Sequence, residues 1–160
     1  MPFKKYLKIK KGISVIEILI IIAIIVIALV SLLELATFSL KLSIQNRETT
    51  QAKNISEEAL EAVRNFRDGT TWDTNGLGTL NLDTIYHLEK TNDSPPKWNF
   101  VPGSETIYGF ERRVVLSKVF RDANDNIAAS GTEDSNTKKI TVTISWKDKK
   151  VEIIDYLTNF

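Results

Sequence analysis

The chain has 160 residues, of which 42% are hydrophobic and 26% charged, and its formal net charge is +1. This length allows one ordinary domain, or a smaller domain with an anchor. The near-neutral charge argues against a protein that binds nucleic acid through bulk positive charge. With no cysteine and a single histidine, the chain excludes disulfides, thiolate zinc sites, iron–sulfur clusters, cysteine nucleophiles and paired-histidine metal sites.

The charge is unevenly distributed, beginning with a basic segment at residues 1–12. This segment contains no acid and five lysines, which are Lys4, Lys5, Lys8, Lys10 and Lys11. Only three basic residues follow in the 20 residues after Leu33. The positive-inside rule therefore predicts an N-terminus in the cytoplasm and a C-terminal part outside it.

Residues 13–33 form an apolar run in which only Ser14, Glu17 and Ser31 are not apolar. As a helix these 21 residues are about 31 Å long, close to the thickness of the hydrocarbon core of a bilayer. We therefore expect a transmembrane helix. A cleaved secretory signal peptide is the alternative, but such peptides have a shorter apolar region and a small-residue cleavage site, for which Ala28 and Ser31 are poor candidates.

Glu17 is the most informative residue of this run. An acid inside a membrane-spanning segment costs on the order of 2.5–3.5 kcal/mol at the centre and less near the interface, so it points to a functional site. The alternative is that Glu17 has no functional role and its side chain only extends to the lipid headgroups, because it lies only four residues inside the run.

The sequence around Glu17, KKGISVIEILI from Lys10 to Ile20, resembles the prepilin motif of type IV pilins and type II secretion pseudopilins. In that family a membrane peptidase cuts after the glycine of a short basic leader, and the new N-terminal amine is methylated. The resemblance implies cleavage between Gly12 and Ile13, with Glu17 as the fifth residue of the mature chain. The family usually has Phe as its first mature residue, so whether Ile13 is methylated stays open.

The resemblance also implies how such a chain assembles and with what. The Glu17 carboxylate of one subunit would pair with the Ile13 amine of another as N-terminal helices pack side by side. The implied partners are the membrane, other pilin-like subunits, the prepilin peptidase and methyltransferase, and an assembly platform. Before processing the chain would span the cytoplasmic membrane once, and afterwards it would belong to a fibre at the cell surface.

Residues 34–68 are more polar but keep a helical pattern. Apolar residues recur with the helical period at Ile55, Ala59, Val63 and Phe66, and Asp68-Gly69 supplies a stop in which the glycine suits a left-handed position. One helix is therefore predicted from about Ile13 to about Arg67. Its outer half would be amphipathic and would pack on the rest of the chain.

Between Gly69 and Gly103 the sequence is rich in turn residues, with a short strand predicted near residues 84–88. Gly76-Leu77-Gly78 is not a dinucleotide fingerprint, because no third glycine and no strand–turn–helix pattern accompany it. His87 lacks the partners of a catalytic triad. We therefore expect no enzyme activity and no cofactor.

The C-terminal third predicts antiparallel strands at residues 108–119, 138–146 and 151–157, with residues 147–150 as a tight hairpin connection. The expected fold class is α+β, a long N-terminal helix packed on an antiparallel sheet, which is also the pilin-like architecture. The predicted divisions are a cleaved leader at 1–12, a transmembrane and assembly helix at 13–33, an amphipathic outer half at 34–68 and a β-rich external head at 69–160.

The loop predicted at residues 122–136 partly matches a calcium-binding loop through Asp122, Asn124, Asn126 and Glu133. Ile127 stands where that loop requires glycine, and strands rather than helices flank it. An ordinary exposed loop is the favoured interpretation, and no metal site is predicted.

Three functions remain open at this point. The favoured one is a structural subunit of a type IV pilus or secretion pseudopilus, more consistent with a minor than a major subunit. The alternatives are a permanently anchored single-pass protein with an external binding domain, and an exported anchored enzyme. Removal of residues 1–12 would leave 16 Lys and Arg against 20 Asp and Glu, so the mature chain would be acidic.

Overall fold

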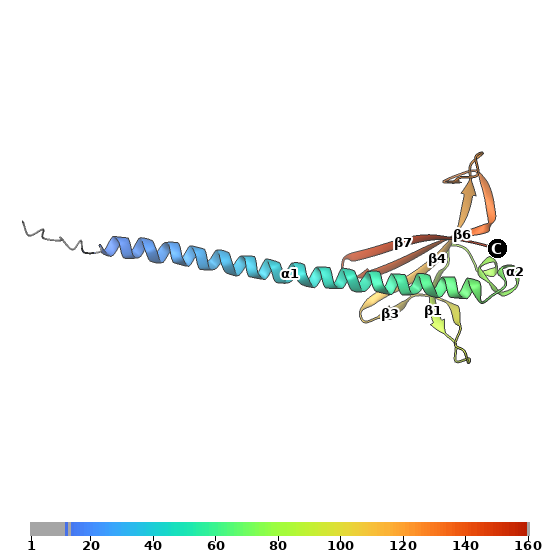
Figure 1. Cartoon of the computed structure of the whole chain (residues 1–160), viewed down its shortest axis with the longest axis horizontal. Helices are drawn as coiled ribbons and strands as arrows, with labels where there is room; N and C mark the ends of the chain where they lie inside the picture. Colours follow the sequence, from blue (N-terminus) through green and yellow to red (C-terminus); the bar gives the residue numbers. More distant parts are fainter. Residues whose placement is uncertain (1–11, 13, 160) are drawn as a thin grey trace, which may run out of the picture. The chain divides into compact units, whose positions relative to one another are not determined.

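The structure, a computed structural model, describes residue 12 and residues 14–159 (Figure 1). Its elements in chain order are α1 (Val15–Asp68), α2 (Trp72–Asn75), a 3-10 turn η1 (Leu77–Thr79), β1 (Ile85–Lys90), β2 (Trp98–Pro102), β3 (Glu105–Ile107), β4 (Phe110–Arg121), β5 (Ile127–Ala128), β6 (Thr132–Trp146) and β7 (Lys149–Thr158). One long helix and an antiparallel sheet make the chain an α+β protein, as the sequence predicts. The chain divides into two compact units, Met1–Asn46 and Arg47–Phe160, each of which is described by itself.

In the first unit, the described residues are dominated by the first part of α1. Every large apolar side chain from Val15 to Ile44 is exposed to the surroundings. A water-soluble helix does not expose apolar residues on all faces. Among the described residues, α1 is also the one helix that is long and apolar enough to cross a membrane.

The second unit, which we call the head, contains the sheet and the last part of α1. The strand order is β2-β1-β4-β6-β7, and β3 and β5 also pair with β4. All pairs are antiparallel. Two equally long ladders join β6 to β4 and to β7, and β4 also pairs with β1, so β4 and β6 form the centre of the sheet (Figure 1).

The last part of α1 packs its apolar stripe on one face of this sheet. The four residues of the predicted stripe, Ile55, Ala59, Val63 and Phe66, are all buried, which confirms that prediction. Alternate residues of β4 and β6 supply the opposite side of the core, among them Val114, Leu116, Ile140, Val142 and Ile144. Period 3.6 in the helix and period 2 in the strands thus meet in one apolar layer.

Two polar contacts fasten α1 to the far strands of the sheet. The Glu48 carboxylate accepts hydrogen bonds from Trp146 Nε1 (3.2 Å) and from Lys147 Nζ (2.6 Å), and the bond from Lys147 is the main reason that the pKa of Glu48 is lowered. Sixteen residues later, Arg64 Nη2 donates to Asp155 of β7 at 2.9 Å.

The C-terminal end of α1 is capped by other hydrogen bonds than the prediction assumed. The helix stops at Asp68, but Gly69 is not among the glycines with positive φ, so the predicted left-handed cap is wrong. Instead the Thr70 hydroxyl donates to the carbonyl oxygen of Phe66 at 2.6 Å, and the Gly69 amide donates to that of Asn65. These bonds satisfy two of the last carbonyl groups without a left-handed residue.

Several predicted strand boundaries are also wrong, and the largest error is at β6, which begins at Thr132 rather than at residue 138. Tyr108 is not part of a strand: Tyr108 (φ 51°) and Gly109 (φ 86°) form the turn between β3 and β4, which begins at Phe110. Positive φ at both central residues is the geometry that a two-residue hairpin requires. The connection predicted at residues 147–150 is shorter, because Trp146 pairs directly with Lys149 and leaves Lys147-Asp148 as the turn.

Candidate functional site

The candidate processing and assembly site is built around the start of α1. Gly12 is exposed, and a side chain at this position would meet nothing within 4 Å. The helix begins at Val15, where the Ser14 carbonyl oxygen accepts the first bonds, from the amides of Glu17 (3.0 Å) and Ile18 (3.3 Å). Ile13 and the five lysines of the predicted leader, Lys4, Lys5, Lys8, Lys10 and Lys11, lie outside the described residues.

Glu17 lies in the first turn of α1 with its side chain exposed. The positive end of the helix dipole favours a carboxylate at this position. Within residue 12 and residues 14–159, the Glu17 carboxylate makes no ion pair or side-chain hydrogen bond. An acid among exposed apolar side chains can therefore receive a cationic partner, and an apolar setting strengthens such a pair while making an unpaired charge costly.

Glu34 is the second acid in the apolar part of α1 and serves as a natural comparison. It is exposed, and its backbone carbonyl accepts a bond from the Thr37 hydroxyl at 2.8 Å. It lies 17 residues beyond Glu17, which is about 26 Å along a helix. The two acids therefore occupy opposite ends of the predicted span.

The two glycines beside Leu77 have a packing role. A side chain on Gly78 would lie 2.6 Å from Trp72 Cδ1, and one on Gly76 would lie 2.8 Å from the carbonyl oxygen of Thr71. The indole of Trp72 is buried in the core. These glycines allow α2 and η1 to fold tightly over the end of the sheet.

His87 lies on β1 in an ordinary polar setting. Its Nδ1 is 3.2 Å from the carbonyl oxygen of Gly103, and its Nε2 is 3.0 Å from Glu89 Oε1. Neither neighbour is a hydroxyl or a thiol, so His87 does not form the nucleophile–histidine pair of a catalytic triad with them.

The residues that partly match a calcium loop are engaged in other contacts. Asp122 Oδ1 accepts the amides of Asn124 (2.8 Å) and Asn126 (2.9 Å), and these backbone bonds lower the pKa of Asp122. Glu133 is turned away and pairs with Lys118 at 2.7 Å. The loop is also shorter than predicted, because β5 and the start of β6 occupy part of residues 122–136. Across the described part of the chain, no group of three acidic or histidine side chains is arranged to hold a metal ion.

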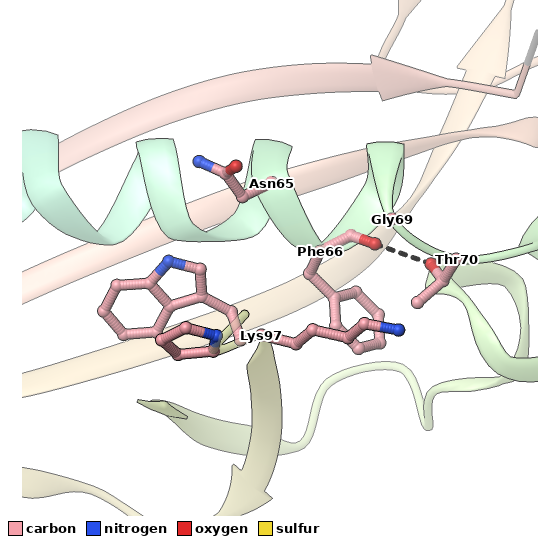
Figure 2. Close-up of a pocket in the computed structure, with 7 residues that line it drawn as sticks. Asn65, Phe66, Gly69, Thr70 and Lys97 are labelled. Carbon is pink, nitrogen blue, oxygen red and sulfur yellow. Dashed lines mark hydrogen bonds between the residues drawn. The ribbon is translucent and has the colours of Figure 1, made fainter. Parts of the chain in front are cut away.

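A small pocket lies beside the C-terminal end of α1 (Figure 2). Its volume is about 210 Å³, and it is lined by Asn65, Phe66, Gly69, Thr70, Pro96, Lys97 and Trp98. Lys97 is its one charged lining residue, and no carboxylate, hydroxyl–histidine pair or metal-ligating cluster faces it. The pocket is smaller than the sites that usually bind drug-sized ligands.

Three features of the head were not predicted from the sequence. They are the contacts of Glu48, the turn at Tyr108-Gly109, and the ion pair between the buried Arg112 of β4 and Glu105 of β3. The Glu48 partners lie 98 and 99 residues away in the chain, and no local pattern could reveal them. The turn did carry a signal, because Gly109 after Tyr108 interrupts the strand pattern.

The comparisons with known proteins gave no match. No protein-family model, no curated protein and no solved structure is significantly similar to this chain.

Proposed function

We propose that this protein is a structural subunit of a type IV pilin-like fibre, either a pilus or a secretion pseudopilus. In this proposal the chain is cut after Gly12 and assembles through its N-terminal helix. The single observation that carries it is the spacing from Gly12 to Glu17, with Glu17 in the first turn of a helix that is long and apolar enough to span a membrane. The lysine-rich residues before Gly12 support the same proposal.

The mechanism follows from charge in an apolar medium. Cleavage would create a positive amine at Ile13, four residues before the Glu17 carboxylate. Helices of two subunits that pack side by side with a stagger can place the amine of one against the carboxylate of the other. The attraction of the pair then offsets the desolvation cost of the two charges, whereas an incorrect stagger leaves both charges unpaired, so the correct stagger is favoured.

The α+β layout of the chain is compatible with this role. The apolar stripe of α1 is covered by the sheet only from Ala52 onward, which leaves the earlier apolar residues exposed for a membrane or for neighbouring helices. A chain of this kind would begin as a single-pass protein with its head outside the cytoplasm and end in a fibre at the cell surface.

Mass spectrometry of the N-terminus tests the processing step. In cells that possess a prepilin peptidase, we expect a chain that begins at Ile13, with or without a methyl group. Substitution of Gly12 by Val should leave the leader attached. A chain that keeps its leader in such cells would instead favour the alternative, a permanently anchored protein with an external binding domain.

The assembly step is tested by comparing Glu17→Ala with Glu34→Ala. Both variants should insert in the membrane, because each removes one charge from α1. We expect Glu17→Ala to lower incorporation into fibres by at least about tenfold, since an unpaired amine in an apolar interface costs more than about 1.4 kcal/mol. Glu34→Ala should incorporate as the wild type does. Normal incorporation of Glu17→Ala in sheared or immunolabelled fibres would refute the pairing.

A further inference from the structure

Two hairpin turns lie together at one end of the head. Glu111 of β4 pairs with Ser145 of β6. The turn before β4 and the turn after β6 therefore lie at the same end of these two strands. The rings of Phe110 and Trp146, which flank these turns, have centroids 5.4 Å apart. We call the Tyr108–Gly109 turn, residues 147–150 and the adjacent residues Arg47 and Glu48 the proximal end of the head.

The proximal end is where the chain enters the head from the membrane-spanning part. Glu48 is the second residue of this unit, and its carboxylate accepts hydrogen bonds from both Trp146 and Lys147. In the preceding unit, exposed apolar residues continue as far as Ile44, only four residues before Glu48. Residues 15–44 as a helix are about 45 Å long, which matches a bilayer together with its headgroup regions.

The charge of the proximal end is opposite to that of the head as a whole. Residues 47–160 carry 15 Lys and Arg against 18 Asp and Glu. The proximal end carries four basic residues, Arg47, Lys147, Lys149 and Lys150, against the two acids Glu48 and Asp148. The Glu48 carboxylate is turned into the sheet, whereas the side chains of Lys147 and Lys150 are 70% and 72% exposed.

Tyr108 adds an aromatic side chain to this basic surface. It is 88% exposed, the highest value among the large hydrophobic residues of the chain that the structure describes. It also has φ of 51°, a left-handed conformation that is rare for a bulky residue. Folding alone does not account for an aromatic side chain at this position, since it buries little area there. Tyrosine and lysine are both side chains that anchor proteins at the membrane–water interface.

We propose that the proximal end of the head binds anionic phospholipid headgroups on the outer surface of the membrane while the subunit is still anchored. Lys149 and Lys150 supply the attraction to phosphate, and the Tyr108 ring enters the headgroup layer. This contact holds the head at the membrane surface while the chain is anchored. The inference rests on the anchor and orientation of the proposed function, but not on cleavage or fibre assembly.

The expected strength follows from the number of lysines. A lysine near an anionic surface contributes about a fivefold gain in the ratio of bound to unbound head. The pair that Lys150 makes with Glu152, at 3.9 Å and largely exposed, competes only weakly. Lys147 is shared with Glu48, so Lys149 and Lys150 are the residues to vary.

The experiment uses the full uncut chain, one copy per lipid nanodisc. Because the chain has no cysteine, Thr106→Cys places one spin label on exposed β3 near the proximal end, and Ser130→Cys places one in the exposed connection between β5 and β6 as a reference. Accessibility to oxygen and to a water-soluble nickel reagent is measured in phosphatidylcholine discs with and without phosphatidylglycerol. Lys149→Gln/Lys150→Gln is compared with Lys97→Gln/Lys139→Gln, which removes the same charge elsewhere.

With phosphatidylglycerol, we expect the label at residue 106 to lose contact with the nickel reagent, and the label at residue 130 to be unchanged. The Lys149/Lys150 double variant, or salt of about 1 M, should abolish the effect, whereas the Lys97/Lys139 control should keep it. Equal accessibility in both lipids overturns the proposal, as does an effect that the Lys149/Lys150 variant retains. Protection that occurs only with several copies per disc would also overturn it, in favour of contact between subunits. Because the chain is uncut, none of these results depends on processing.

Discussion

The guanidinium group of Arg112 is the most deeply buried charge in the head. Its side chain is only 3% exposed, and its Nε donates to Glu105 Oε1 at 2.7 Å. Within the described residues, its Nη1 atom is buried without a hydrogen-bond partner. Arg112 occupies a core-facing position of β4, between Phe110 and Val114. The Glu105 carboxylate therefore offsets the free-energy cost of burying the Arg112 charge.

We predict that Glu105→Gln destabilises the head by about 1–3 kcal/mol, because it leaves the buried guanidinium without its charge partner. Glu133→Gln is the matched control, since its partner Lys118 is about half exposed, and such pairs contribute about 1 kcal/mol or less. Urea unfolding of the full chain in detergent, followed by tryptophan fluorescence, measures both. Equal losses in the two variants would contradict the importance of burial.

At the same scale, the sequence was informative where chemistry is local and uninformative where partners are distant. The order of Gly12, Ile13 and Glu17 after a basic segment can be read directly. The role of Arg112 could not be read, because its partner lies on β3, a three-residue strand that carries too little pattern to be predicted. A charged residue in an alternating strand gives no sign by itself that it will be buried.

At the scale of elements, α1 and the central strands were predictable because each repeats its pattern many times. The buried stripe of α1 follows the period of 3.6, and β6 and β7 alternate through most of their length. β2 and β3 were missed, and β4 was given two residues too many at its start. Short strands and turn residues with positive φ depend on the pairing of neighbouring strands, which local periodicity does not contain.

Small residues set how closely α1 approaches the sheet. Ala52, Ala59 and Ala62 are at most 1% exposed. We predict that Ala59→Leu destabilises the head by about 1–3 kcal/mol, because the packed interface has no room for the added atoms. Glu58→Leu, one residue earlier on the exposed face, should change stability by about 0.5 kcal/mol or less. A neutral Ala59→Leu in thermal unfolding monitored by near-UV circular dichroism would show that the interface is loosely packed.

At the scale of the whole molecule, the formal net charge of +1 is the sum of segments that differ in their charge. Residues 1–12 carry only basic charges, the apolar part of α1 carries very little charge, and the head is acidic apart from its proximal end. This division could be predicted from the sequence, because it depends only on where the charges stand along the chain. The grouping of lysines with Tyr108 could not be predicted from the sequence, because it requires the β3–β4 turn and the β6–β7 turn to lie at the same end of the sheet.

The stability of the acidic head should decrease as the pH falls into the acidic range. Four carboxyl groups of the head, those of Glu48, Glu111, Asp122 and Asp134, have pKa values lowered by hydrogen bonds and nearby cations. For Asp134 the causes are the Thr137 hydroxyl and then Arg121. A lowered pKa in the folded state means that the unfolded chain binds protons first as the pH falls. The stabilisation is therefore complete above the ordinary values of 3.8 for Asp and 4.5 for Glu and is lost below them.

We therefore predict that the melting temperature of the full chain in a neutral detergent is nearly constant from about pH 7 to 5 and falls below about pH 4. Asp134→Asn should melt lower at neutral pH, because it loses the charge opposite Arg121, and should show a smaller decrease on acidification. Asp73→Asn is the matched control, since Asp73 lies on α2 and makes no ion pair among the described residues. A melting temperature that rises on acidification would mean that repulsion among the acids of the head outweighs these local contacts.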